Sequence, residues 1–291
     1  DLRREGIFQK VSELSEKTEN ELMKQACMNY LDSFHNGKIN MIASDELVKL
    51  LEKEKTGVEG TLIKDILNSK DILSKKSQWI IGGDGWAYDI GFSGLDHIFA
   101  SGEDVNILVL DTEVYSNTGG QLSKSTQTGA TAEFATNGKS GKKKSLADIA
   151  MSYEDVYVAQ VSMGANNLQC VKAFSEAESY HGTSIIIAYA PCILHGISGG
   201  MTYTQTEEKR AVECGYWNLF RFDPRLKEEG KNAFILDSQE PKLDYKEFFT
   251  GEVRFSALTR SNPERAKELL EKAKKNAKER YEHLKKLATQ E

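Results

Sequence analysis

The spacing of apolar residues changes once along this 291-residue chain. In the first part, residues such as Ile7, Val11 and Leu14 recur at helical intervals, a pattern that predicts amphipathic helices. Ser44 precedes the acid-led segment DELVKLLEKEK, and we interpret it as the N-cap of a helix. Residues 1–77 are therefore predicted to form a helical segment that packs on a main domain.

Residues 78–291 alternate short apolar runs with helically spaced segments and form the predicted main domain. Four runs are predicted strands: 78–83, 104–112, 155–162 and 183–190. A helix is expected over 201–214 and a further strand in YWNLFRF. A long C-terminal helix is expected from Pro263, with Ser261 and Asn262 as cap candidates. This order predicts an α/β fold with a doubly wound, mostly parallel sheet and right-handed crossovers.

Composition and charge exclude several classes of protein. Apolar residues make up 39% of the chain and charged residues 28%, with a formal net charge of −6. The acidic balance argues against a nucleic-acid-binding surface. No apolar run has the length of a membrane span, and no signal segment opens the chain, so we expect a soluble intracellular protein. The chain opens at Asp1 without Met, which suggests a fragment or a processed product.

The four cysteines are Cys27, Cys170, Cys192 and Cys214. They are widely spaced, and a large acidic chain with so few cysteines is not a disulfide scaffold. The sequence contains no C-x-x-C pair, so it does not predict a self-contained zinc or iron–sulfur site. Small buried apolar side chains are the default interpretation of all four.

Two polar segments follow the first two predicted strands: GGDGWAYDIG, residues 82–91, and DTEVYSNTGGQ, residues 111–121. In an open parallel sheet, ligands bind outside the carboxyl ends of the strands. We expect Gly83 and Gly85 to let the backbone turn sharply and approach a ligand closely. The helix that follows them directs its amide groups and the positive end of its dipole toward the same place, which favours phosphate.

Asp84 is a carboxylate at the point where phosphate is expected. A divalent cation between the two removes the conflict, since Mg²⁺ commonly bridges carboxylates to substrate phosphates. The second segment adds the Thr112 hydroxyl, loop carbonyls and the Asn117 amide. Together the two segments predict a metal–diphosphate clamp, in which Asp111 is interpreted as a turn cap and is not assigned to the metal.

The stretch from Tyr115 to Lys144 contains many glycines and hydroxyl residues. A loop of this length in a compact α/β unit is typically functional or disordered. Its end, GKSGKKKS, contains Lys142, Lys143 and Lys144. We interpret these lysines either as a solvated flexible loop or as a docking site for acidic ferredoxin or the phosphates of coenzyme A.

The paired segments resemble the thiamine diphosphate motif, in which Asp and Asn hold magnesium and the diphosphate of the cofactor. With GYWNLFRFDPRL, the chain from Gln78 onward is similar to the carboxyl-terminal thiamine-binding domain of the pyruvate:ferredoxin (or flavodoxin) oxidoreductases, also called pyruvate synthases. The resemblance implies oxidative decarboxylation of pyruvate, with coenzyme A taking the acetyl group. Electrons then pass through iron–sulfur clusters to ferredoxin or flavodoxin. It also implies a homodimeric full enzyme in the cytoplasm, or in an anaerobic organelle of a eukaryote.

Within this resemblance, the magnesium ligands are Asp84, the Thr112 hydroxyl and the Val114 carbonyl. Asn117 matches a residue near the reacting end of the cofactor, where its amide can donate to a developing oxyanion. The residues that match the diphosphate-binding segments are Gly83, Asp84, Gly85, Trp86, Thr112, Glu113, Val114, Tyr115, Ser116 and Asn117. Trp86 and Tyr115 are equally compatible with core or lid aromatics.

Cys192 matches the last cysteine ligand of the [4Fe–4S] cluster nearest to thiamine in that family. The other ligands lie upstream in the family, and this chain has no matching cysteines, so it cannot hold such a cluster alone. The family's activating glutamate and most of its pyruvate and coenzyme A contacts also come from an amino-terminal part of the chain. We therefore expect a fragment that depends on the remainder of the parent polypeptide and turns over no pyruvate by itself.

Two alternatives remain open from the sequence. One is a thiamine-dependent decarboxylase, or a 2-oxoacid oxidoreductase with another substrate. The other is a non-catalytic phosphate-binding module that keeps the fold without the chemistry. His97 and His195 are interpreted as structural in either case.

Overall fold

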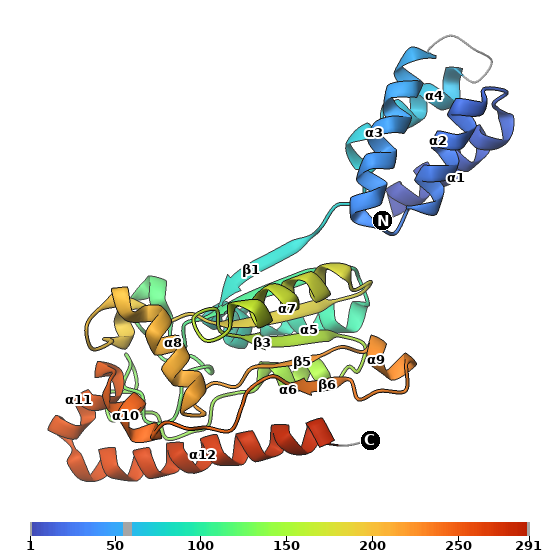
Figure 1. The fold of residues 1–291 in the computed structure, drawn as a ribbon. Coiled ribbons are helices and arrows are strands. Elements are labelled where there is room, and N and C mark those ends of the chain that lie inside the picture. The colour runs from blue at the N-terminus through green and yellow to red at the C-terminus, as the bar shows by residue number, and fades with distance from the viewer. Residues whose placement is uncertain (1, 55–59, 290–291) are drawn as a thin grey trace. The chain divides into compact units, whose positions relative to one another are not determined.

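The computed structural model describes residues 2–54 and 60–289. The chain divides into two compact units, unit 1 (Asp1–Ser77) and unit 2 (Gln78–Glu291). Figure 1 shows the first as helices alone and the second as helices around a sheet. Each unit is described by itself.

Unit 1 is built from helices with a common apolar interior. Its elements are α1 (Leu2–Lys17), α2 (Glu21–Asp32), α3 (Gly37–Lys53), α4 (Gly60–Leu67) and the 3₁₀ turn η1 (Lys70–Ile72). Leu14, Tyr30 and Leu47 are among the side chains that are fully buried in its core. The helical character predicted for this region is therefore confirmed within the described residues.

The start of α3 differs from the prediction. Asn36 is the N-cap, and its side-chain oxygen accepts a hydrogen bond from the backbone of Ile39 at 3.2 Å. Ser44 lies inside the helix, where it is buried and its hydroxyl has no hydrogen-bond partner. The interpretation of Ser44 as a cap is wrong because an earlier asparagine offers the same capping oxygen and lets the helix begin sooner.

Unit 2 contains one six-stranded sheet with the order β1-β2-β4-β3-β5-β6. Its strands are β1 (Trp79–Gly83), β2 (Asn106–Asp111), β3 (Tyr157–Val161), β4 (Ser184–Tyr189), β5 (Phe220–Phe222) and β6 (Phe234–Leu236). The first four are parallel to one another, whereas β5 runs antiparallel to both β3 and β6. The predicted α/β class with a mostly parallel sheet is confirmed.

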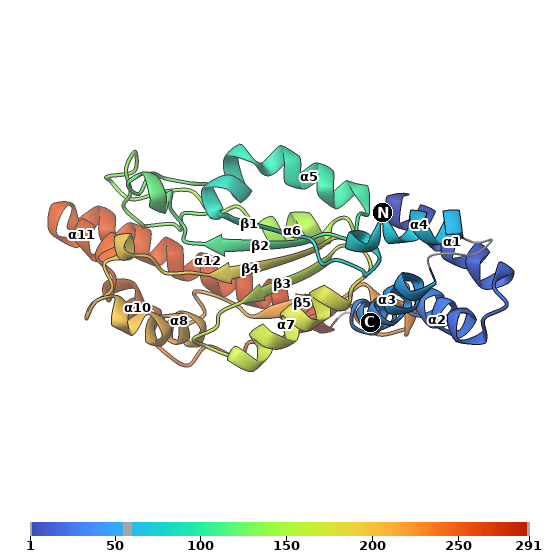
Figure 2. The same cartoon turned by 90° about the horizontal axis from the view of Figure 1, so that it is seen from above.

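Helices cover both faces of this sheet. They are α5 (Phe92–Ser101), α6 (Leu146–Met151), α7 (Asn167–Ser179), α8 (Thr204–Glu213), α9 (Arg225–Glu228), α10 (Tyr245–Thr250), α11 (Val253–Ser261) and α12 (Pro263–Thr289). Ile185 and Ile187 share an apolar cluster with residues of α5, α6 and α12, whereas Ile186 packs with residues of α7. Because strand side chains alternate between faces, α7 lies opposite α6 and α12. Figures 1 and 2 show these layers from two directions.

The C-terminal helix begins where the sequence predicts. Pro263 is the first residue of α12, and the side chain of Asn262 accepts a hydrogen bond from the backbone of Arg265 at 3.2 Å. The buried stripe of this helix includes Ala273 and Leu284. None of the helices in the described part of the chain is long and apolar enough to cross a bilayer.

Candidate functional site

The two polar segments meet at one edge of the sheet. Strands β1 and β2 are neighbours with Gly83 opposite Leu110, so the residues that follow each strand come together. The Thr112 hydroxyl lies 2.8 Å from Oδ1 of Asp84 and 3.0 Å from the carbonyl oxygen of Val114. The three candidate metal ligands therefore form one compact group of oxygen atoms.

Asp84 is a buried carboxylate. Among the described residues, the hydrogen bonds found to its side chain come only from hydroxyl groups. It is 1% exposed, and the Ser123 hydroxyl donates to its Oδ2 at 2.5 Å. Burial and then the charge of Asp111 raise the pKa of Asp84 to about 6, against the opposing effect of the two hydroxyls. A buried carboxylate in this situation gains from a cation placed beside it.

Asp111 is turned toward other partners beneath the loop. Its carboxylate accepts hydrogen bonds from the Tyr88 hydroxyl at 2.8 Å and the Ser125 hydroxyl at 2.5 Å. It also accepts from the backbone of Glu113 at 3.1 Å and forms an ion pair with Lys143 at 2.7 Å. These contacts agree with its interpretation as a cap of the turn.

Glu113 stands between two candidate ligands and points its side chain into the protein. Its side chain is 0% exposed and pairs with Lys143 at 3.0 Å and with Arg254 at 2.8 Å. The Tyr216 hydroxyl also donates to it. Burial alone would raise the pKa of Glu113, but Lys143 and Arg254 outweigh that effect and hold it at about 2. Only the backbone of Glu113 is available to a ligand outside.

The two glycines that flank Asp84 have different surroundings: a side chain at position 83 would meet only the Leu110 carbonyl oxygen, at 4.0 Å, whereas position 85 is closely packed. Neither Gly83 nor Gly85 has a positive φ, and the close approach to a ligand expected of them stays a prediction. A side chain at position 85 would collide with the ring of Tyr115, whose hydroxyl donates to the Gly85 carbonyl at 3.1 Å. After Asp84 the chain forms a π-helical turn, Gly85–Ile90, which leads into α5.

The aromatic side chains of the two segments hold the backbone in place. The Trp86 ring packs where a side chain at position 82 or 91 would otherwise lie, and Tyr115 bridges the second segment to the first. Both are partly buried. We therefore assign them a packing role, one of the two interpretations left open by the sequence.

Asn117 lies in the short 3₁₀ turn Ser116–Thr118 and is exposed. Its neighbour Ser116 donates from its hydroxyl to the Thr112 hydroxyl at 2.7 Å. On either side of this turn, the backbone N–H of Tyr115 donates to the Gln121 carbonyl oxygen at 3.0 Å. This bond closes the loop, so that the turn carrying Asn117 projects from the edge of the site.

The long stretch 115–144 is buried in its middle part and exposed at several other positions. Ser123, Ser125 and Thr126 are buried and hydrogen-bonded beneath the candidate ligands. His195 lies behind the same ligands, with Nε2 2.8 Å from the Thr112 carbonyl oxygen. The hydroxyl-rich composition that suggested a functional or disordered loop thus provides internal partners for buried carboxylates.

The three consecutive lysines have three different environments. Lys142 is exposed and pairs with Glu279 at 2.8 Å, whereas Lys144 lies 3.0 Å from the centre of the Phe92 ring. Lys143 is only 15% exposed and pairs with Asp111 and Glu113. A solvated or docking role for all three is therefore wrong, because the two buried carboxylates draw Lys143 inward. Adjacent identical residues carry no sequence signal of this difference.

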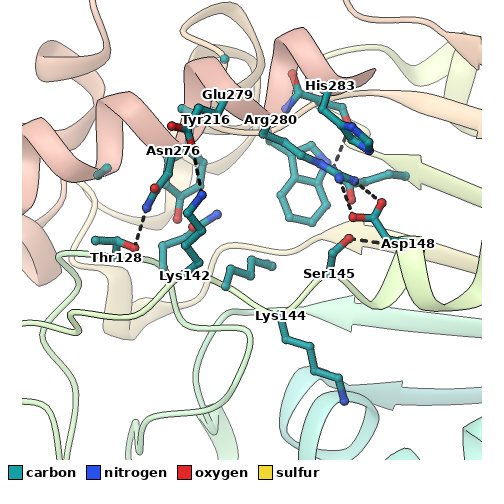
Figure 3. Close-up of a pocket in the computed structure, with 18 of the residues that line it drawn as sticks. Thr128, Lys142, Lys144, Ser145, Asp148, Tyr216, Asn276, Glu279, Arg280 and His283 are labelled. Carbon is teal, nitrogen blue, oxygen red and sulfur yellow. Dashed lines mark hydrogen bonds and ion pairs between the residues drawn. The ribbon is translucent and has the colours of Figure 1, made fainter. Parts of the chain in front are cut away.

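A cavity of about 350 Å³ lies between this lysine segment and α12. Figure 3 shows the polar contacts across it: Arg280 forms a two-point ion pair with Asp148, and Asn276 donates to Thr128. With the Lys142–Glu279 pair, these contacts tie the segment that carries Lys143 to the C-terminal helix.

Cys192 follows β4 and is partly buried. None of Cys170, Cys192 and Cys214 forms a disulfide in the described part of the chain. Across residues 2–54 and 60–289, no group of three or more His, Cys, Asp or Glu side chains is arranged to hold a metal. The oxygen group around Asp84 differs from such clusters because it contains a hydroxyl and a carbonyl beside a single carboxylate.

Comparison with known families bears directly on this site. Residues 69–188 match the family described as "Thiamine pyrophosphate enzyme, C-terminal TPP binding domain", and this segment contains Asp84, Thr112 and Val114. The resemblance to a thiamine-binding domain inferred from the motifs is confirmed for this segment, which contains β1, β2, β3 and most of β4.

Similarity to individual proteins extends over most of the chain. It is 52% identical to the pyruvate:ferredoxin oxidoreductase of Moorella thermoacetica, over 98% of this chain and 24% of that protein. It is 58% identical to the pyruvate-flavodoxin oxidoreductase of Enterobacter agglomerans, over 76% of this chain and 19% of that protein. It is 48% identical to the mitochondrial pyruvate dehydrogenase (NADP(+)) of Euglena gracilis, over 90% of this chain and 14% of that protein.

These relatives are oxidoreductases, and the chain spans about a quarter or less of their length. Among solved structures, a 2-oxoglutarate:ferredoxin oxidoreductase from Magnetococcus marinus matches with a TM-score of 0.39 and 20% identity. That match covers 43% of this chain and 44% of the other.

Proposed function

We propose that unit 2 binds magnesium and thiamine diphosphate at the edge of the sheet formed by the ends of β1 and β2. Asp84, the Thr112 hydroxyl and the Val114 carbonyl would hold the metal. The observation that supports this is their mutual contact, at 2.8 and 3.0 Å, within a segment of the thiamine-binding family. Oxygen atoms are the ligands that Mg²⁺ prefers.

The environment of these atoms fits a bound cation. Asp84 is buried and has no ion-pair partner among the described residues, while the nearby cation Lys143 is occupied by Asp111 and Glu113. A magnesium ion would neutralise Asp84 and the charge of the diphosphate, and thiamine diphosphate would supply the carbanion chemistry. The protein residues orient the cofactor and exclude water from its charged end.

The remaining predicted residues would contact the diphosphate and the reacting end. The backbones of residues 83–86 and 112–117 line the diphosphate position, with Glu113 taking part through its main chain only. Asn117, exposed on its projecting turn, would lie near the reacting end of the cofactor and donate to an oxyanion there.

We propose further that the chain acts as part of a pyruvate:ferredoxin or flavodoxin oxidoreductase in the cytoplasm or an anaerobic organelle. The whole enzyme would convert pyruvate and coenzyme A to acetyl-CoA and CO₂ and pass electrons through iron–sulfur clusters. Cys192 would complete a [4Fe–4S] cluster whose other ligands come from the remainder of the parent polypeptide, in a homodimer. The similarity to pyruvate oxidoreductases over most of this chain supports this proposal.

The choice of substrate is tested with the full-length parent enzyme. Reduction of a dye with pyruvate, and not with 2-oxoglutarate or 2-oxoisovalerate, is the expected result. A preference for either other acid would replace pyruvate in the proposal. Pyruvate-dependent dye reduction by the present chain alone would contradict its dependence on the parent polypeptide.

The binding site is tested by thermal unfolding of the chain with and without magnesium and thiamine diphosphate. Ligand at a hundred times its dissociation constant stabilises the folded state by about 2.7 kcal/mol, which corresponds to a rise in Tm of roughly 5 to 10 °C. The rise should require magnesium and disappear in Asp84→Ala. Glu103→Ala, an exposed acidic residue before β2, is the matched control. Binding by Asp84→Ala would remove Asp84 from the site.

A further inference from the structure

Glu113 adopts a backbone conformation that its side chain disfavours. Its φ of +59° is left-handed, a conformation that is strained for a non-glycine residue. It lies directly between Thr112, whose hydroxyl contacts Asp84, and Val114, whose carbonyl oxygen contacts that hydroxyl. The unusual turn at Glu113 therefore determines how these two oxygens are placed.

One buried and one largely buried cation hold the Glu113 side chain at opposite oxygens. Lys143 contacts Oε1 at 3.0 Å, and Arg254 contacts Oε2 at 2.8 Å. Lys143 is itself held by Asp111, and Arg254 by Glu252 at 2.6 Å. These fixed cations come from two segments distant from Glu113 in sequence, one before α6 and one at the start of α11.

We propose that Lys143 and Arg254 are positioning residues of the metal–diphosphate loop and that they act through Glu113. This inference rests on the proposed function. Their two ion pairs offset the strain at Glu113 and direct its carboxylate inward, so that it does not compete with the neighbouring oxygens for the metal. Partners behind the ligands commonly influence metal affinity in this way.

A simpler role for Lys143 predicts the opposite result. If Lys143 only neutralised nearby carboxylates, its removal would leave the region around Asp84 more negative and strengthen cation binding. If it positions the loop through Glu113, its removal releases the turn and weakens binding. The sign of the change in affinity therefore separates the two roles.

The test is calorimetric titration of the folded chain with magnesium and thiamine diphosphate. Lys143→Met should weaken binding by about 10- to 100-fold, the usual effect of losing a partner behind a metal ligand. Lys143→Arg, which keeps the charge, should bind more tightly than Lys143→Met. Lys142→Met is the matched control and should bind like wild type. Unchanged or tighter binding by Lys143→Met would overturn the proposal.

The action through Glu113 is tested with Glu113→Gly, since glycine tolerates the left-handed turn without strain. The proposal predicts weaker binding in this variant, because the side chain that the cations hold is gone. Adding Lys143→Met to it should then change the affinity by less than about threefold, as expected when two residues act as one unit. A full, additive loss in the double variant would contradict action through Glu113.

Two further measurements keep the outcomes distinguishable. Hydrogen exchange at the amides of residues 112–121, without ligand, should be at least about tenfold faster in Lys143→Met than in Lys142→Met. Equal exchange rates in the two variants would overturn the positioning role. Failure of the wild-type chain to bind the cofactor would refute only the proposed function, and the exchange measurement would still test the positioning role. If Lys143→Met does not fold, Lys143→Met with Asp111→Asn, which removes one charge of each sign, takes its place in both measurements.

Discussion

The interior of unit 1 and the strand-end region of unit 2 are stabilised by different interactions. In unit 1 the core is a set of apolar helix side chains such as Leu14, Tyr30 and Leu47, and ion pairs such as Lys10–Asp65 lie at the surface. In unit 2 the buried side chains behind the site include Glu113 and Arg254, each 2% exposed or less. The interior of unit 1 is mainly apolar, whereas the strand-end region of unit 2 is a network of charged groups.

This difference determines how each region responds to change. Apolar packing is non-directional, so a lost contact costs roughly in proportion to the volume removed. A buried charge depends on each specific partner, since the partner left behind is uncompensated. The network also fixes the directions of its groups, which a binding site requires and a packed helical core does not.

The largest expected effect is the loss of a cation from the network. Arg254→Met leaves Glu113 and Glu252 short of their partner and should lower the free energy of unfolding of unit 2 by about 3–5 kcal/mol. Denaturant unfolding followed by tryptophan fluorescence measures this directly, because Trp79, Trp86 and Trp217 all lie in unit 2.

The matched control for that change is on the same helix. Arg260→Met alters an exposed residue of α11 and should change stability by less than about 0.5 kcal/mol. Equal effects of the two variants would show that the buried network contributes no more than an ordinary surface side chain.

A cavity in the apolar core of unit 1 should have a somewhat smaller effect. Leu47→Ala removes a fully buried side chain of α3 and should lower the stability of unit 1 by about 3 kcal/mol. The slowest-exchanging amides of α3 provide the measurement. Ile42→Ala, at a position 53% exposed on the same helix, should leave them nearly unchanged, and a comparable loss there would remove the distinction between core and surface.

The next effect depends on pH and isolates Asp84. The pKa of Asp84 is raised to about 6 in the folded state from an ordinary 3.8. Between these two pH values the folded state keeps the Asp84 proton, whereas the unfolded state has lost it. Its contribution to stability is therefore complete below about pH 4 and is lost as the pH rises to about 6. Without magnesium, the free energy of unfolding of wild type should fall by roughly 2–3 kcal/mol relative to that of Asp84→Asn as the pH rises through this window. Parallel pH profiles of the two proteins would show that Asp84 is ionised throughout.

The smallest effect is expected at the surface of unit 1. Lys10→Met breaks an ion pair of 2.8 Å whose side chains are 42% and 47% exposed, and it should cost less than about 1 kcal/mol. Asp65→Asn should behave alike, since it removes the other half of the pair. A loss as large as that of Arg254→Met would mean that exposed and buried pairs do not differ in this protein.

Local patterns predicted much of the fold and part of the site. The apolar run TSIIIAYA forms the largely buried strand β4, and Asn262 and Pro263 mark the start of α12, because these signals depend on nearest neighbours. They fail at Ser44, where the capping oxygen of Asn36 starts the helix earlier. The two polar segments predicted the meeting of Asp84 and Thr112, because parallel neighbouring strands end at the same edge.

The amino-acid sequence alone determined the alternating strands and helices, the resemblance to the thiamine-binding domain, and the candidate ligands Asp84, Thr112 and Val114. Only the tertiary structure decided that Lys143 turns inward between Lys142 and Lys144, and that Arg254 meets Glu113 from 141 positions away. Helix and strand patterns arise from residues close along the chain. A buried charge instead takes its partners from whatever the fold brings near, and no local spacing records that choice.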